Sequence, residues 1–98
     1  MDQSVTVVGR FKATEGLDRI LKEILLTLIE PSRKDEGCIK YDLHQAVDDP
    51  TRFIFYEIWE SREHLSRHSA TPHVQNTRAK AKDLLAEAPE VTLLTKIA

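Results

Sequence analysis

A short segment of the sequence concentrates the side chains that can do chemistry. Residues 55–73, FYEIWESREHLSRHSATPH, hold three of the four histidines and the only tryptophan, together with Glu57. Imidazole and carboxylate groups act as general acids and bases, and histidine also binds metals. The segment is therefore a metal site, one wall of a catalytic pocket, or a strand and helix that carry ordinary polar residues.

A zinc site is the first possibility to weigh, because His64 and His68 are four residues apart and would share one face of a helix. A usual zinc site needs a third ligand and supporting partners, and HLSRH lacks the glutamate of the HExxH motif. Cys38 is the only cysteine, so a cysteine cluster is excluded. We therefore predict no metal site.

The elements that must position these residues follow from hydrophobic spacing. Residues 4–11 form a short segment rich in β-branched residues, which predicts a first strand. Apolar residues then recur in steps of three and one from Leu17 to Ile29, which predicts an amphipathic helix. Thr14 is the predicted N-cap of this helix, and Pro31 should end or kink it.

The second half of the chain predicts a β-hairpin, two helices and a last strand. Residues 38–47 alternate, residues 52–60 are aromatic and β-branched, and DDPT between them is a turn. Ser61 should cap a short helix, and Thr71 with Pro72 should begin a second one that runs to about residue 88. Pro89 should stop that helix, and residues 90–97 predict a closing strand.

This order predicts a ferredoxin-like α+β fold, β-α-β-β-α-β, in a single domain over residues 1–98. Its antiparallel sheet would carry the helices on one face only. The strand at 52–60 is apolar or aromatic at nearly every position, so its second face also needs a cover. In so short a chain the expected cover is a second copy, and we predict a homodimer.

The two faces of this strand decide where Glu57 points. One face holds Phe53, Phe55, Glu57 and Trp59, and the other holds Ile54, Tyr56 and Ile58. We expect the purely apolar set to pack on the helices, so that Glu57 and Trp59 face the space between two sheets, where His44 joins them. That composition is typical of a small-molecule pocket. The alternative is that Glu57 pairs with Lys40 or Arg10 across the sheet and only stabilises it.

Composition and charge argue against several classes of protein. The chain is 41% hydrophobic and 31% charged, as in soluble globular domains, and its net charge of −2 gives no reason to expect nucleic acid or an anionic membrane as partner. RNA-recognition modules share the element order, but RFIFYEIW lacks their glycines. No apolar run is long enough to span a membrane, MDQSVTVVGRF lacks the features of a signal peptide, and a lone cysteine favours a reducing compartment. We expect a cytoplasmic location.

Residues 36–75 resemble the core pattern of the antibiotic biosynthesis monooxygenase (ABM) family, which includes the quinol monooxygenases. The corresponding residues are Glu36, Gly37, Cys38, Tyr41, Leu43, His44, Pro50, Phe53, Glu57, Trp59, His68, Pro72 and His73. The resemblance implies a dimeric α+β barrel. For many members it also implies oxygenation of a quinol or dihydroxyarene without metal, flavin or haem. Haem-degrading members rely on an asparagine on the first strand, which SVTVVGRF lacks.

Such a reaction needs a base, an oriented substrate and a dry pocket. Under this resemblance we predict a catalytic set of His44, Glu57, Trp59 and His68, and a substrate-binding set of Phe53, Phe55, His64 and His73. The predicted function is a cofactor-independent monooxygenase that uses dioxygen on a small quinol or dihydroxyarene. Two alternatives stay open: a non-catalytic, ligand-binding or regulatory dimer, and an isomerase, since related barrels include isomerases.

Overall fold

The computed structural model describes residues 3–98. Met1 and Asp2, the first two residues of the predicted domain and of the segment MDQSVTVVGRF, lie outside the described residues. The strands are β1 (Val5–Lys12), β2 (Cys38–Gln45), β3 (Arg52–Trp59) and β4 (Glu90–Leu94). The helices are α1 (Asp18–Leu26), α2 (Ile29–Arg33), α3 (Arg62–Ser69) and α4 (Pro72–Ala81), and α4 continues into the 3-10 turn η1 (Lys82–Leu84).

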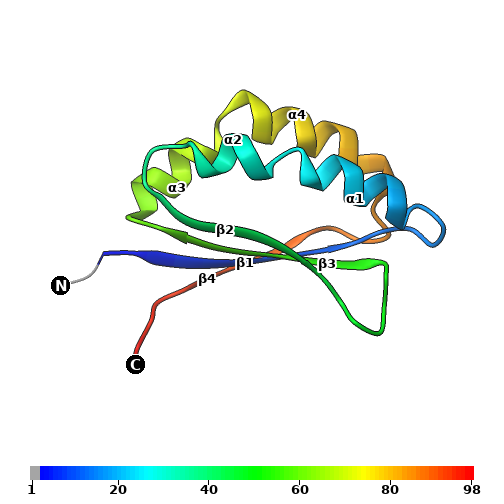
Figure 1. The fold of residues 1–98 in the computed structure, drawn as a ribbon, viewed down its shortest axis with the longest axis horizontal. Coiled ribbons are helices and arrows are strands. Elements are labelled where there is room, and N and C mark those ends of the chain that lie inside the picture. Colours follow the sequence, from blue (N-terminus) through cyan, green and yellow to red (C-terminus); the bar gives the residue numbers. More distant parts are fainter. Residues whose placement is uncertain (1–2) are drawn as a thin grey trace.

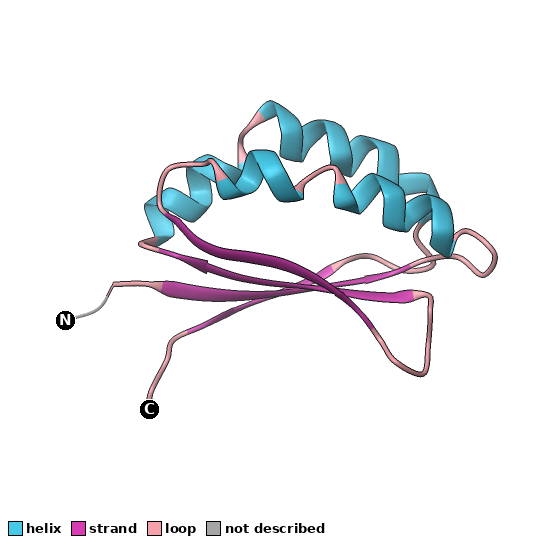
Figure 2. Cartoon of the chain, viewed as in Figure 1, coloured by secondary structure: helices cyan, strands magenta, loops and turns pink. Residues whose placement is uncertain are grey.

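The four strands form one antiparallel sheet in the order β2-β3-β1-β4. All the helices lie on one side of this sheet and leave the other side open (Figure 1). Figure 2 shows the same two layers by element type, with the helices above and the sheet below. The predicted ferredoxin-like α+β fold is therefore confirmed. Within residues 3–98, no helix has the length and apolar character needed to cross a membrane.

The prediction of which face of β3 meets the helices is wrong. The buried face holds Phe53, Phe55, Glu57 and Trp59, which are 1%, 2%, 8% and 0% exposed. The open face, opposite the helices, holds Ile54, Tyr56 and Ile58 of β3 and Val8 of β1. Burial of one aromatic side chain removes about 150–250 Å² of surface from water. Burying two phenylalanines and a tryptophan therefore removes more apolar surface from water than burying two isoleucines and a tyrosine would. Glu57 is tolerated there because it has a hydrogen-bond partner.

The long helix expected after Thr14 is divided into α1 and α2. The residue before α1 is Leu17, so the predicted Thr14 cap is wrong, and the Thr14 carbonyl instead accepts a 2.9 Å hydrogen bond from the Leu17 amide. The break falls at Thr27, four residues before Pro31. Pro31 has no N–H to donate to the carbonyl of Thr27, and its ring crowds that carbonyl, so the helix stops and restarts. The predicted effect of Pro31 is confirmed.

The second helical region begins at Pro72, as predicted, but it is shorter than expected. α4 ends at Ala81, and the chain becomes extended at Leu85 rather than near residue 88. The cause is pairing with the sheet, because Leu85 forms an antiparallel bridge with Ala13 at the end of β1. This bridge brings the chain to the edge of the sheet, where β4 then pairs with β1.

A bulge at the start of β2 explains a further difference from the alternating pattern. Cys38 pairs with Trp59 and Lys40 pairs with Ile58, so Ile39 is the extra residue between them. Ile39 is 59% exposed although the alternation placed it on the same face as the buried Tyr41.

Candidate functional site

A cavity of about 80 Å³ lies between the sheet and the helices. Its wall is largely apolar, and the side chains in it that can do chemistry are Tyr41, Glu57, His68, Thr77 and Arg78. The exposed wall residues are Arg78 on α4 and Val91 on β4, so the cavity opens to solvent between these two elements. A cavity of about 150 Å³ accepts benzene. An aromatic ligand would therefore need this cavity to enlarge.

Glu57 is held by the tryptophan that follows it on the same face of β3. Nε1 of Trp59 donates a 2.9 Å hydrogen bond to Oε1 of Glu57. Burial raises the pKa of Glu57, while the Trp59 hydrogen bond and the positive charge of Arg78 lower it. The net result is a carboxyl group with a raised pKa on a cavity wall, which is typical of groups that exchange protons during catalysis.

His68 is the second titratable group on the wall. It comes from the last turn of α3, is 5% exposed, and stacks on Trp59 with ring centroids 4.4 Å apart. The ring of Tyr41 packs against it edge-on, with centroids 5.3 Å apart. Burial lowers the pKa of His68, and the hydrogen bond and charge of Asp35 oppose that shift.

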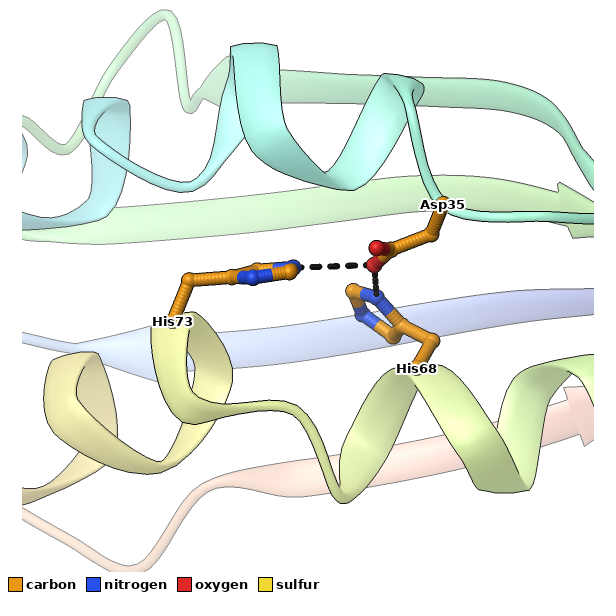
Figure 3. A group of neighbouring side chains, drawn as sticks. All are labelled: Asp35, His68 and His73. Atoms are coloured by element: carbon orange, nitrogen blue, oxygen red, sulfur yellow. Dashed lines mark hydrogen bonds and ion pairs between the residues drawn. The ribbon is translucent and has the colours of Figure 1, made fainter.

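Asp35 joins two histidines into one cluster (Figure 3). Its Oδ2 atom lies 2.8 Å from Nδ1 of His68 and 2.9 Å from Nε2 of His73. Asp35 is in the turn between α2 and β2, where its amide bonds to Ser32 and its carbonyl to Cys38. The histidines flank the corner between α3 and α4, so each helix presents one imidazole to the carboxylate.

The donor atoms of this cluster are of the kinds that zinc and iron bind. In residues 3–98, Asp35, His68 and His73 form a group whose ligand atoms lie within 4.8 Å of one another. The group offers three donors, and both nitrogens already make contacts of hydrogen-bond length to the same oxygen atom. We therefore describe the cluster as a hydrogen-bonded one. The sequence pair His64 and His68 does not converge on a common point, because His64 has other partners.

The structure brings together only part of the predicted site. Phe55, Glu57 and His68 line the cavity, with Trp59 packed behind the last two. His73 adjoins the site through Asp35 rather than through the cavity. Phe53 is buried in the core beside β1 and is not part of the cavity wall.

Two predicted histidines are placed elsewhere. His44 is exposed and pairs with Ile54 on the open face, so the prediction that it shares a pocket with Glu57 is wrong. The strand alternation that puts Tyr41 on the cavity side puts His44 on the other. His64 contacts the hydroxyl of Ser61 at 2.7 Å and packs over Gly37, which gives it a structural position at the start of α3.

The alternative roles for Glu57 are excluded by the same alternation. Lys40 forms an ion pair with Asp42 at 3.1 Å, and Arg10 forms one with Glu90 at 3.5 Å. Lys40 and Arg10 both lie on the open face of the sheet, whereas Glu57 lies on the buried face. Trp59 is the hydrogen-bond partner of Glu57 there.

Three residues of the site were not singled out in the sequence as functional. Asp35 lies in a polar helix exit, 33 residues from His68, and no local pattern connects them. Arg78 was recognisable in part, since it lies four residues after Val74 and three before Ala81, at the border of a helical apolar stripe. Burial raises the pKa of Tyr41, so its hydroxyl stays protonated at the cavity wall.

Comparison with known proteins gives a consistent family. The model of the antibiotic biosynthesis monooxygenase (ABM) family matches residues 4–80. "Uncharacterized protein sll1783" of Synechocystis sp. is 32% identical over 92 residues, which are 94% of this chain, and the chain spans 63% of that protein's length. "Putative monooxygenase Rv0793" of Mycobacterium tuberculosis is 32% identical over 97 residues, which cover 99% of this chain and 95% of that protein.

Solved structures agree with this result. The structure of Rv0793 matches with a TM-score of 0.91 at 32% identity, and covers 97% of this chain and 96% of that one. The crystal structure of PA3566 from Pseudomonas aeruginosa matches with a TM-score of 0.93 at 31% identity, and covers 100% of this chain and 98% of that one. The chain thus belongs to the antibiotic biosynthesis monooxygenase family.

Proposed function

We propose that the protein is a cofactor-independent monooxygenase that oxidises a small quinol or dihydroxyarene with dioxygen. Its family membership supports monooxygenase chemistry. The observation that carries the proposal is that Glu57 and His68 face one largely apolar cavity. A base in such a place can remove a phenolic proton and leave an electron-rich anion, which is itself able to reduce dioxygen.

The proposed reaction balances without an external reductant. A quinol and dioxygen give a hydroxyquinone and water: one ring C–H becomes C–OH, both quinol hydroxyls become carbonyls, and the second oxygen atom leaves as water. The substrate supplies all the electrons. The protein supplies a base, alignment of the ring, and a site from which bulk water is excluded.

Each of these roles is proposed from the chemistry of a residue on the cavity wall. Phe55 and Tyr41, whose ring centroids are 5.3 Å apart, provide an aromatic wall for the substrate ring. Glu57 or His68 takes the phenolic proton, and Arg78 at the opening favours the anion that remains. The small volume of the cavity favours a single-ring substrate, so benzenediols should react faster than naphthalenediols.

A homodimer through the open face completes the proposal. Tyr56 and Leu94, 36% and 43% exposed, lie on this face with the half-buried Val8, Ile54 and Ile58. A stable dimer interface buries roughly 800 Å² on each partner, and an apolar sheet face is a suitable surface for it. In that arrangement each subunit keeps its own cavity on the far side of its sheet, under the helices.

Oxygen consumption by chelator-treated protein tests the proposed reaction. The panel contains hydroquinones, catechols and naphthalenediols, and the reference is autoxidation in buffer. We expect uptake above that reference, reduced by about 10²-fold or more in whichever of the variants Glu57→Gln and His68→Gln removes the base. Glu60→Gln is the matched control, because Glu60 is exposed just beyond the end of β3.

Failure of this test would have a definite meaning. If no member of the panel raises oxygen uptake but one raises the melting temperature without being consumed, the protein is a ligand-binding dimer rather than an oxygenase. If a panel member is converted to an isomer without oxygen uptake, the protein is an isomerase.

A further inference from the structure

One carboxylate oxygen receives two imidazole donors in this structure. Oδ2 of Asp35 lies within 2.9 Å of a nitrogen of each histidine, Nδ1 of His68 and Nε2 of His73. An ionised carboxylate only accepts hydrogen bonds, so both nitrogens carry hydrogen. Figure 3 shows the two rings reaching this oxygen from α3 and α4.

These contacts determine the tautomer of His68. A neutral imidazole carries hydrogen on one nitrogen only, so a protonated Nδ1 leaves Nε2 with a free lone pair. His68 is part of the cavity wall, whereas Asp35 and His73 are not. The lone pair therefore belongs to the one ring of the cluster that a substrate can reach.

We propose that Asp35 is a positioning residue that holds Nδ1 of His68 protonated, so that Nε2 of His68 is the base for the substrate hydroxyl. This inference rests on the proposed oxygenase function and selects His68 over Glu57 as the proton acceptor. His73 is a second positioning residue, because its hydrogen bond fixes the orientation of the same carboxylate.

The proton transfer conserves charge. The substrate O–H bond breaks, its electron pair stays on the oxygen, and a new N–H bond forms at Nε2 of His68. The resulting imidazolium is adjacent to the negative Asp35, which is 18% exposed at its side chain, so the new charge forms beside an opposite one. A protonated Glu57 would carry an O–H donor, and Trp59, which donates to this carboxyl group, cannot accept that hydrogen.

The charged groups around His68 fix the expected pH dependence. Burial lowers the pKa of His68, Asp35 raises it, and the charges of His73 and Arg78 lower it. Since the base must be neutral, kcat/KM should fall as pH decreases through this pKa. Removal of Asp35 should lower the pKa and move the inflection to lower pH, which a merely structural role for Asp35 would not do.

The wild-type tautomer can be measured without any turnover. Long-range ¹⁵N–¹H correlation spectra of the chelator-treated protein at neutral pH should show His68 with Nδ1 protonated and Nε2 bare. In Asp35→Ala the Nδ1–H form should lose its preference. His68 with Nε2 protonated in the wild type would overturn the proposal, even if the oxygenase function holds. The expected tautomer with no turnover on any substrate would refute the proposed function instead.

Kinetics on an active substrate supply the second test. Asp35→Ala should lower kcat by about tenfold or more while KM changes little, because Asp35 does not line the cavity. Added formate should restore part of that rate. Asp48→Ala, in an exposed turn, is the matched control. If Asp35→Ala does not fold, His73→Gln replaces it, again with a lower kcat and little change in KM expected. An unchanged kcat in the folded variant would overturn the proposal.

A metal centre is the competing explanation of the same three side chains. Chelator-treated wild type titrated with Zn²⁺ or Fe²⁺ should keep its histidine signals and its oxygen uptake. Stoichiometric shifts of both histidines, with oxygen uptake that only the metal restores, would overturn the positioning role.

Discussion

The indole nitrogen of Trp59 donates a 2.9 Å hydrogen bond to Oε1 of Glu57, two residues earlier on the same face of β3. Both residues are buried beneath the helices. A donor at this position favours the ionised carboxylate, whereas burial favours the neutral acid. Trp59 therefore affects the charge of the cavity even though its own side chain is packed behind the wall.

Trp59→Phe should raise the pKa of Glu57 and destabilise the fold. The variant removes a donor to a buried charged group, which is worth about 1.5–3 kcal/mol. Carboxyl ¹³C chemical shifts measure the pKa, and urea unfolding measures the stability. Phe53→Leu is the control, since Phe53 is buried on the same face of β3 but its side chain donates no hydrogen bond to Glu57. An unchanged pKa in Trp59→Phe would contradict the assigned role.

Glu57→Gln should remove a specific loss of stability with pH. The folded pKa of Glu57 is raised above its ordinary value of 4.5, so the folded state binds a proton more tightly than the unfolded state. Stability should therefore fall as pH rises from about 4.5 through the folded pKa. In Glu57→Gln this fall should be absent, as measured by urea unfolding between pH 4 and 7. Glu60→Gln, which alters an exposed carboxylate, should retain it.

The order of elements was predictable because it depends on local patterns. Alternation identified β2, aromatic and β-branched residues identified β3, the three-and-one spacing identified α1, and Ser61 and Pro72 marked the starts of α3 and α4. The covered face was not predictable in this way, because alternation divides β3 into two faces without stating which of them meets the helices. That choice depends on the total aromatic area, which Phe53, Phe55 and Trp59 dominate.

The candidate site was predictable only where its residues are close in sequence. Glu57, Trp59 and His68 are close in sequence and stay together in space. His44 was assigned to them on the assumption about the covered face, so it failed with that assumption. Asp35 could not be identified, because a turn residue meets α3 and α4 only after the helices have packed.

Gly37→Ala should be more destabilising than Gly16→Ala. Both glycines have positive φ, +84° for Gly37 and +89° for Gly16, so alanine at either position costs about 1–2 kcal/mol. A Cβ at Gly16 has open space, whereas one at Gly37 would overlap the imidazole of His64. The difference between the two variants in urea unfolding measures this overlap. His64→Ala should recover part of the loss in Gly37→Ala, and equal losses at the two glycines would show that the ring moves freely.

The open face gives the last prediction, on assembly. Tyr56 lies at its centre, paired with Val8 on one side and Asp42 on the other. Tyr56 is 36% exposed in the monomer, so a lysine in its place keeps its ammonium group in water and the subunit should still fold.

In a dimer formed through this face, Tyr56→Lys would bury two ammonium groups. The cost is about 3 kcal/mol or more, so Kd should rise by about 10²-fold or more. Light scattering coupled to size exclusion measures the mass across a dilution series. Ile20→Lys is the matched control, because Ile20 is 50% exposed on α1, away from the sheet, and should leave the dimer intact. If wild type is a monomer at every concentration, or if only Ile20→Lys dissociates it, the open face is not the interface.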